Sequence, residues 1–268
     1  MFKYTLVPGG DEIVEKDLRT LQQAIEGKKY DSLLLFGSFA KGEGLVLHGK
    51  PRNDYDLMLL GGNEETEKAL LEADINTEVD VFSVDAVPSV CTQQMFEMAY
   101  AHEVIAGNKV PFPKWQPYEI PYVDAIESLG KRSASLMLAK YEMGKDDPDY
   151  RKVAEQIDKA IIAIGDAILI KRGQFHPRYT TRAIMLGSDE IGGLYTMAVQ
   201  NKITGFPEHS PDRLWELWFA VRDEMRMYVV QNKIKNDKTE VVVQYSEAIT
   251  QDQLVKILPL MGVDKKWL

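Results

Sequence analysis

Two aspartates separated by one residue, Asp54 and Asp56, open an apolar segment that runs to Leu60. In an extended strand, residues i and i+2 project from the same face, so the two carboxylates are expected to be neighbours. Like charges at the edge of a buried segment repel each other, and a divalent cation between them would offset that repulsion. Carboxylate oxygens are hard ligands that suit magnesium, which also binds phosphate oxygens. The pair predicts a metal site; the alternative is two solvent-facing acids at a strand end.

A third acid, Asp80, stands in the segment Glu78–Phe82, where acidic and apolar residues alternate. If this segment is a strand that pairs with the strand after Asp54, Asp80 falls opposite Asp54 and Asp56. Three carboxylates around two metal ions are the arrangement that two-metal phosphoryl transfer uses. A lone acid in a strand is usually an ordinary edge residue, so the prediction depends on all three acids occurring together.

Gly37 and Ser38 follow the short apolar run Ser32–Phe36, and Lys41 comes three residues later. The run is typical of a buried strand that ends at the glycine and continues into a short helical turn. Gly37 lets the backbone approach a ligand closely, and the N–H groups that open the turn can bind phosphate oxygens. Ser38 adds a hydroxyl donor. The alternative is an ordinary Gly-Ser turn.

The segments that must position these residues alternate between helical and strand patterns in the first part of the chain. We expect a helix over residues 11–27 and strands over residues 2–7, 32–36, 55–60 and 79–84. Four prolines then crowd the stretch from Pro111 to Pro121, which cannot be helical. We therefore predict an α/β domain over residues 1–110, with a small mixed sheet and flanking helices, a proline-rich linker over 111–121 and a mainly α-helical domain over 122–268.

Helical periodicity dominates the second domain. Helices are predicted over residues 125–143, 150–172 and 211–235, with a strand over 239–245 and a short helix near 252–258. Ser210 is a good N-cap for the third of these helices, and Pro211 suits its first position.

The order strand, Gly-Ser, short helix, Asp-x-Asp strand and third acid resembles the nucleotidyltransferase superfamily of DNA polymerase β. The resemblance covers residues 30–85 and rests on Gly37-Ser38, Asp54-Tyr55-Asp56-Leu57 and Val79-Asp80-Val81. It implies transfer of a nucleoside monophosphate from a nucleoside triphosphate, with ATP as the expected donor, and release of pyrophosphate. The helical second half resembles, in architecture only, the kanamycin and lincosamide nucleotidyltransferases, where such a domain lines the acceptor pocket.

The resemblance also assigns roles to single residues. Gly37 and Ser38 would hold the triphosphate together with Lys41, while Asp54 and Asp56 would bind two Mg²⁺ ions. Asp80 would bind the second ion or accept the proton of the acceptor hydroxyl. Residues 44–52 form a longer connection than the shortest family members have, and they could be a lid or part of acceptor recognition.

Polar residues that interrupt the apolar helices of the second half are candidates for binding the nucleotide or its acceptor. Lys159 and Asp166 are seven residues apart and share a helix face, with Lys159 as the phosphate candidate. The segment 171–179 is a further candidate for the acceptor pocket. The alternative for these residues is an ordinary solvated face.

Composition restricts the class of protein and its partners. The chain has 268 residues, 45% of them hydrophobic, a single cysteine, and a net charge of −9. The acidic balance argues against a large basic surface for nucleic acid, and no apolar run is long enough for a membrane span. We expect a cytoplasmic protein whose partners are a nucleoside triphosphate and an acceptor; its aromatic and methionine side chains would fit core or homodimer packing.

Three functions remain open. The first is nucleotidyl transfer to a hydroxyl of a small molecule such as a sugar or an antibiotic-like compound. The second is nucleotidylation of a protein or tRNA in a toxin–antitoxin setting. The third is a catalytically inactive nucleotide-binding module, against which the presence of all three acids argues, because an inactive site has no physical need for mutually repelling carboxylates.

Overall fold

The computed structural model describes residues 3–205, 209–245 and 250–263. Within them the chain divides into two compact units. Unit 1 comprises residues 1–120, 176–181 and 203–205, and unit 2 comprises residues 121–175, 182–202 and 206–268. The chain first passes from unit 1 to unit 2 between Ile120 and Pro121, within the stretch of prolines. Unlike the continuous domains expected from the sequence, the units exchange two short segments later in the chain.

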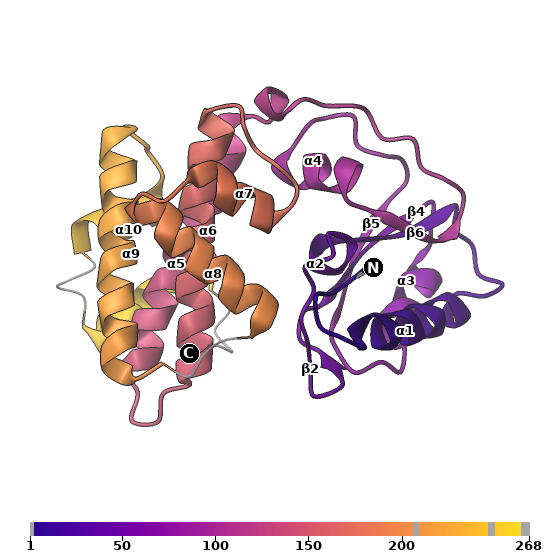
Figure 1. Cartoon of the computed structure of the whole chain (residues 1–268), viewed down its shortest axis with the longest axis horizontal. Helices are drawn as coiled ribbons and strands as arrows, with labels where there is room; N and C mark the ends of the chain where they lie inside the picture. The colour runs from indigo at the N-terminus through magenta and orange to yellow at the C-terminus, as the bar shows by residue number, and fades with distance from the viewer. Residues whose placement is uncertain (1–2, 206–208, 246–249, 264–268) are drawn as a thin grey trace. The chain divides into compact units, whose positions relative to one another are not determined.

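Unit 1 is built on a small mixed sheet with flanking helices (Figure 1). Its strands run in the order β5-β4-β1-β6, in which β4 and β5 are parallel and the other pairs are antiparallel. Their bounds are β1 Ser32–Phe36, β4 Tyr55–Leu60, β5 Val79–Val84 and β6 Glu103–Gly107. The helices of this unit are α1 Gly10–Ala24, α2 Gly37–Ala40, α3 Glu64–Leu71 and α4 Gln93–Tyr100, with a 3₁₀ turn, η1, at Pro117–Glu119.

The predicted strands over residues 32–36, 55–60 and 79–84 are confirmed with the same bounds. The predicted helix over residues 11–27 is α1, which begins one residue earlier and ends at Ala24. The predicted strand over residues 2–7 is wrong for its described part, because residues 3–7 make one isolated bridge, from Thr5 to Gly44. Residue 2 lies outside the described residues.

The core of unit 1 lies on one face of the sheet, where alternate strand residues meet α1 and α3. Leu33 and Leu35 of β1 and Leu57 and Leu59 of β4 are fully buried there, together with α1 and α3 residues such as Leu21 and Leu70. Period-two alternation therefore sends the neighbours of these leucines, including Asp56, to the opposite face.

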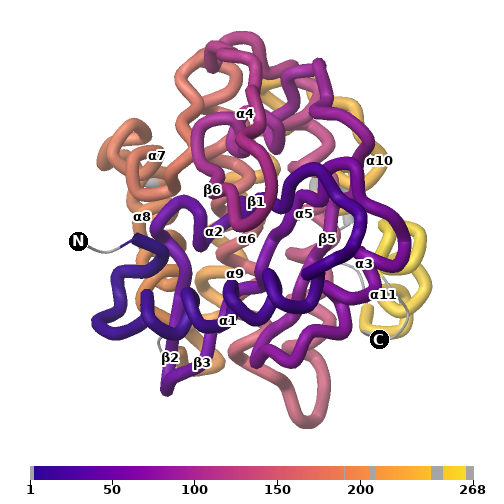
Figure 2. Tube along the Cα trace, turned by 90° about the vertical axis from the view of Figure 1, so that its right-hand side faces the viewer, coloured from indigo at the N-terminus to yellow at the C-terminus, as the bar shows by residue number. Residues whose placement is uncertain are grey.

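The connection over residues 44–52 folds as a two-stranded hairpin rather than an open loop. Its strands are β2 Val46–Leu47 and β3 Lys50–Pro51, and Figure 2 shows the chain turning back between them near the start of α1. Leu45 and Val46 are buried in unit 1, so part of this hairpin belongs to the core.

Unit 2 is helical, as the sequence predicts. Its helices are α5 Tyr122–Met143, α6 Tyr150–Lys171, α8 Glu190–Thr204, α9 Pro211–Gln231, α10 Asp237–Tyr245 and α11 Gln251–Ile257. Helix α7, Tyr179–Leu186, begins in unit 1 and ends in unit 2, and the last residues of α8 also belong to unit 1. Ser210 caps α9 as predicted, since its hydroxyl accepts a hydrogen bond from the Arg213 amide.

The strand predicted over residues 239–245 is wrong, because these residues lie in α10. The segment Thr239–Val243 contains one threonine and three valines, which are β-branched residues that favour a strand locally. Asn236 instead accepts hydrogen bonds at the start of the segment from the amides of Lys238 and Thr239. Val242 is fully buried, and α10 packs against α5 and α9. Tertiary packing thus outweighs local propensity here.

None of the helices within the described ranges is both long enough and apolar enough to cross a lipid bilayer.

Candidate active site

Three chain segments meet at one end of the sheet in unit 1. Strand β1 ends there at Phe36, and because β4 is antiparallel to β1, β4 begins at the same end, with Asp56 opposite Phe36. Strand β5 is parallel to β4 and begins beside it. Strand topology alone therefore brings three groups to the same end of the sheet: the Gly37-Ser38 turn, the Asp54–Asp56 segment and Asp80.

The pairing of β4 with β5 aligns Asp56 directly with Asp80. Register partners on adjacent strands project from the same face, roughly 5 Å apart at their Cβ atoms. The pairing of the two strands, on which the interpretation of Asp80 from the sequence depends, is thus present. Beyond the acids, however, β5 is an edge strand, and Phe82 is 37% exposed rather than buried.

Asp54 lies one residue before β4 and is exposed, whereas Asp56 is half-buried. In the part of the chain that the structure describes, no group of three or more His, Cys, Asp or Glu side chains converges closely enough to hold a metal ion. The carboxylates at this end of the sheet are oxygen ligands, which suit Mg²⁺ in kind, and Asp56 and Asp80 are aligned, but the three side chains do not converge on one point. A site of three carboxylates would require their side chains to turn toward one ion, and it remains a prediction.

Gly37 packs directly against the Asp56 carboxyl group. Its φ is +70°, and an ideal Cβ placed on it would lie 1.8 Å from Oδ2 of Asp56. A side chain at position 37 would thus be strained and would also displace the carboxylate. Glycine is required here both for its backbone conformation and for the space that Asp56 occupies.

Behind the acids, Tyr55 anchors the start of β4 in the core. Its ring is fully buried and stacks on Phe39 of α2, with ring centroids 4.9 Å apart. Its hydroxyl donates to Asp17 of α1 at 3.1 Å. Burial raises the pKa of both the Tyr55 hydroxyl and the Asp17 carboxyl. This anchor was missed from sequence, where Tyr55 reads only as one more apolar residue on the inner face.

Lys41 is almost completely buried, with 3% of its surface exposed. Its ammonium group forms an ion pair with Glu97 of α4 at 2.5 Å and lies 4.5 Å from the centre of the Tyr179 ring. Binding of a triphosphate by Lys41 would have to compete with these contacts. The structure thus gives Lys41 a role in packing around the Gly37-Ser38 turn, and its role as a phosphate ligand stays a prediction.

The candidates in unit 2 differ in their surroundings. Lys159 is partly exposed and forms an i,i+4 ion pair with Glu155 on α6. Asp166 is buried, where it accepts hydrogen bonds from Arg182 at 2.7 Å and Tyr195 at 2.8 Å. Asp166 is thus part of a buried network that joins α6, α7 and α8, a different environment from the solvated face of Lys159.

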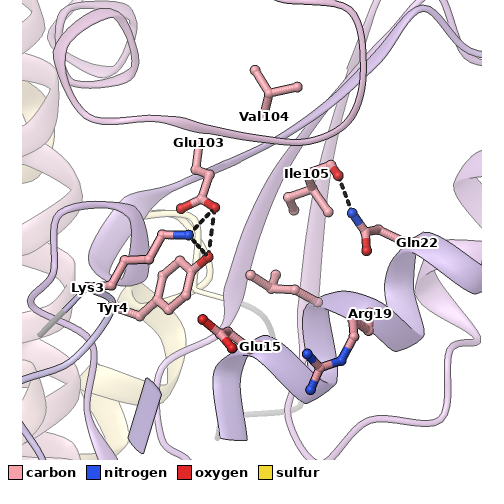
Figure 3. A pocket seen from close by; sticks show the side chains of 9 residues that line it. Lys3, Tyr4, Glu15, Arg19, Gln22, Glu103, Val104 and Ile105 are labelled. Carbon is pink, nitrogen blue, oxygen red and sulfur yellow. Dashed lines mark hydrogen bonds and ion pairs between the residues drawn. The ribbon is translucent and has the colours of Figure 1, made fainter. Parts of the chain in front are cut away.

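A separate polar pocket of about 200 Å³ lies between the N-terminal segment, α1 and β6 (Figure 3). Within it Lys3, Tyr4 and Glu103 form a closed triangle of hydrogen bonds. Burial, together with the hydrogen bond to Glu103, raises the pKa of Tyr4 to about 12 against the opposing effect of Lys3. The pocket is lined by other elements than the ends of β4 and β5 that carry the aspartates. The charged groups of the triangle are paired with each other, and these contacts join the N-terminal segment to β6.

Comparisons of this chain with protein-family models, with curated proteins and with solved structures find no match. Its function must therefore be inferred from its own residues and their geometry.

Proposed function

We propose that this chain is a magnesium-dependent nucleotidyltransferase that moves a nucleoside monophosphate from a nucleoside triphosphate, with ATP as the first candidate, to a hydroxyl of a small acceptor. The observation that carries the proposal is the alignment of Asp56 with Asp80 at the sheet end where Gly37 abuts Asp56. The chemistry requires a place where a polyphosphate and acidic metal ligands meet. The Gly37-Ser38 turn and the aspartates at this end of the sheet would provide such a place, in agreement with the resemblance of residues 30–85 to the DNA polymerase β superfamily.

In this function, Asp54, Asp56 and Asp80 would hold magnesium, which supplies positive charge to the triphosphate and to the charge that develops during transfer. The Gly37-Ser38 turn would orient the triphosphate. The acceptor oxygen then attacks the α-phosphorus, the bond to pyrophosphate breaks, and pyrophosphate leaves with the electron pair of that bond. Asp80 would bind the second ion or take the acceptor's proton. Orientation of the reactants accounts for much of the rate in such in-line transfers.

The direct test is release of pyrophosphate from each of the four common nucleoside triphosphates, with Mg²⁺ and pools of candidate acceptors. We expect release that depends on Mg²⁺ and on the acceptor, and a loss of at least about 100-fold in Asp56→Asn. Asp85→Asn is a matched control, because it makes the same chemical change at an exposed position just beyond the opposite end of β5. Equal rates in Asp56→Asn and wild type would contradict the assignment.

The same assay separates the small-molecule acceptor from the alternatives. With a triphosphate labelled at the α-phosphate, label in a small product supports the proposed function. Label retained on protein or RNA supports nucleotidylation of a macromolecule instead. Binding of triphosphate without any release would favour the inactive module.

A further inference from the structure

Glu43 is a buried carboxylate whose partners come from a distant part of the sequence. Only 2% of its surface is exposed. One oxygen accepts from the Tyr179 amide at 2.9 Å, and the other accepts from the amide and the hydroxyl of Thr180, at 2.8 and 2.7 Å. These donors open α7, so Glu43 caps that helix from 136 residues away in sequence. A negative charge is favourable at this end of a helix dipole.

The backbone of Glu43 is also bound to the Gly37-Ser38 turn. Its amide donates to the carbonyl of Ser38 at 3.0 Å, and the Lys41 amide donates to the carbonyl of Gly37 at 3.2 Å. One residue therefore connects the turn, through its main chain, with the start of α7, through its side chain. All of these residues belong to unit 1.

Lys41 strengthens the same connection from two residues away. The ammonium group of Lys41 lies over the ring of Tyr179 and forms an ion pair with Glu97 of α4. The backbone amide of the same Tyr179 donates a hydrogen bond to Glu43. The buried positive and negative charges on this short loop thus both contact the segment His176–Thr181. Buried charges are costly unless they are paired or fully hydrogen-bonded, so these contacts fix the loop in one arrangement.

We propose that Glu43 is a positioning residue for nucleotide binding, which holds the Gly37-Ser38 turn in place by fastening its loop to residues 179 and 180. This inference rests on the proposed function, because it assigns the turn to the triphosphate. The last residue of the 171–179 segment, Tyr179, then has a defined role: its contacts with Glu43 and Lys41 hold the loop that follows the turn. Glu43 itself touches no reacting atom.

The carboxylate chemistry of Glu43 allows an isosteric test. Glu43→Gln keeps the shape of the side chain but replaces one acceptor oxygen with an NH₂ group, which would face an N–H donor of α7. Glu43→Asp keeps both oxygens on a side chain one methylene shorter. Thr180→Val removes only the hydroxyl donor, and it provides a milder variant if Glu43→Gln does not fold. Glu26→Gln is the matched control, because Glu26 is exposed near the end of α1.

The first measurement is amide hydrogen exchange, which does not depend on activity. In Glu43→Gln we expect the amides of Tyr179 and Thr180 to exchange at least about tenfold faster, while amides in the middle of α6 are unchanged. Glu43→Asp should retain part of the protection, and Glu26→Gln should match wild type. Unchanged exchange at Tyr179 and Thr180 would overturn the proposal.

The second measurement is the kinetics of pyrophosphate release. A displaced turn weakens triphosphate binding, so we expect KM for the triphosphate to rise at least about tenfold in Glu43→Gln and kcat to change by less than about threefold. Thr180→Val should shift KM in the same direction by less, and Glu43→Asp should recover part of the loss. Faster exchange with an unchanged KM would show a purely structural cap and overturn the proposal.

Failure of the proposed function gives a different pattern. If wild type releases no pyrophosphate from any triphosphate, the role of Glu43 in nucleotide binding fails with it, although the exchange data still report the contact with α7. If wild type is active and only the Glu43→Gln kinetics are normal, the function stands and the positioning role alone is overturned.

Discussion

At the scale of single residues, Gly37 and Asp56 depend on each other. The half-buried carboxylate lies against the glycine Cα, so the side chain that would bind a metal also decides which residue can precede Ser38. Tyr55, between the two aspartates, points the other way and fastens the strand to the core through Phe39 and Asp17. The strand is thus fixed to the core at the residue between the two acids.

This dependence predicts different costs for alanine at two glycines of similar backbone conformation. Gly37 and Gly27 have φ values of +70° and +74°, but an added Cβ at Gly27 meets no atom within 4 Å. Gly27→Ala should lower the free energy of unfolding by about 1 kcal/mol through backbone strain alone. Gly37→Ala should cost about 1–2 kcal/mol more, since the clash adds to the strain, and should lose transfer activity. Equal costs in urea unfolding would show that Asp56 does not occupy this space.

At the scale of elements, the strands that carry the acids can be predicted from the sequence, but the way they pair and pack cannot. The apolar runs before Gly37 and after Asp54 are short, nearly continuous and end at glycines, so β1 and β4 are predictable with their bounds. The alignment of Asp56 with Asp80 needs the additional knowledge that β4 and β5 are parallel neighbours. The order of two strands in a sheet is a tertiary property, which residue periodicity does not encode.

The contacts of Glu43 and Lys41 mark where prediction from sequence ends. Both residues are charged and stand next to Gly42, which is typical of an exposed loop. Their burial depends on Tyr179 and Thr180, which are far away in the chain. The sequence likewise fails to predict that α10 is a helix. Its β-branched residues favour a strand locally, but packing against α5 and α9 outweighs that preference.

A buried carboxylate, Asp158, between α6 and α8 predicts that the stability of the protein depends on pH. Asp158 of α6 is buried and accepts a hydrogen bond from Asn201 of α8 at 2.9 Å. Burial raises the pKa of Asp158 to about 7, aided by nearby Glu155 and opposed by the Asn201 hydrogen bond and Lys202. The folded state therefore holds this proton at pH values where the unfolded chain has released it, so stability falls as the pH rises from about 4 to about 7.

Asp158→Asn should remove that dependence. Asparagine cannot ionise, yet its carbonyl oxygen can still accept from Asn201. We expect the variant to be more stable than wild type at pH 8 by roughly 1–3 kcal/mol and to match it near pH 4. Urea unfolding across this pH range provides the measurement. The same fall in stability in both proteins would show that Asp158 is not its source.

At the scale of the whole molecule, the first unit is not made by the first part of the chain alone. Residues 176–181 and 203–205 belong to it, and the first of these segments supplies the donors that satisfy Glu43. A fragment of residues 1–120 would therefore retain the sheet and its acids but lose the partners of a buried carboxylate.

We predict that this fragment is less stable than the same unit in the full chain by about 1.5–3 kcal/mol, the usual cost of losing hydrogen bonds to a charged group. Hydrogen exchange of the β1 and β4 amides, measured in both proteins, reports the stability of the shared sheet. Equal protection of these amides would show that the later segments do not stabilise unit 1.

The central claim, that Asp56 and Asp80 bind a shared divalent cation together with a triphosphate, can be tested without knowing the acceptor. Mn²⁺ can replace Mg²⁺ as a paramagnetic probe, titrated into the protein with a non-hydrolysable ATP analogue. Wild type should bind Mn²⁺ more tightly with the analogue than without it, and Asp56→Asn and Asp80→Asn should each weaken that binding at least about tenfold. Binding as tight in both variants as in wild type would contradict the account.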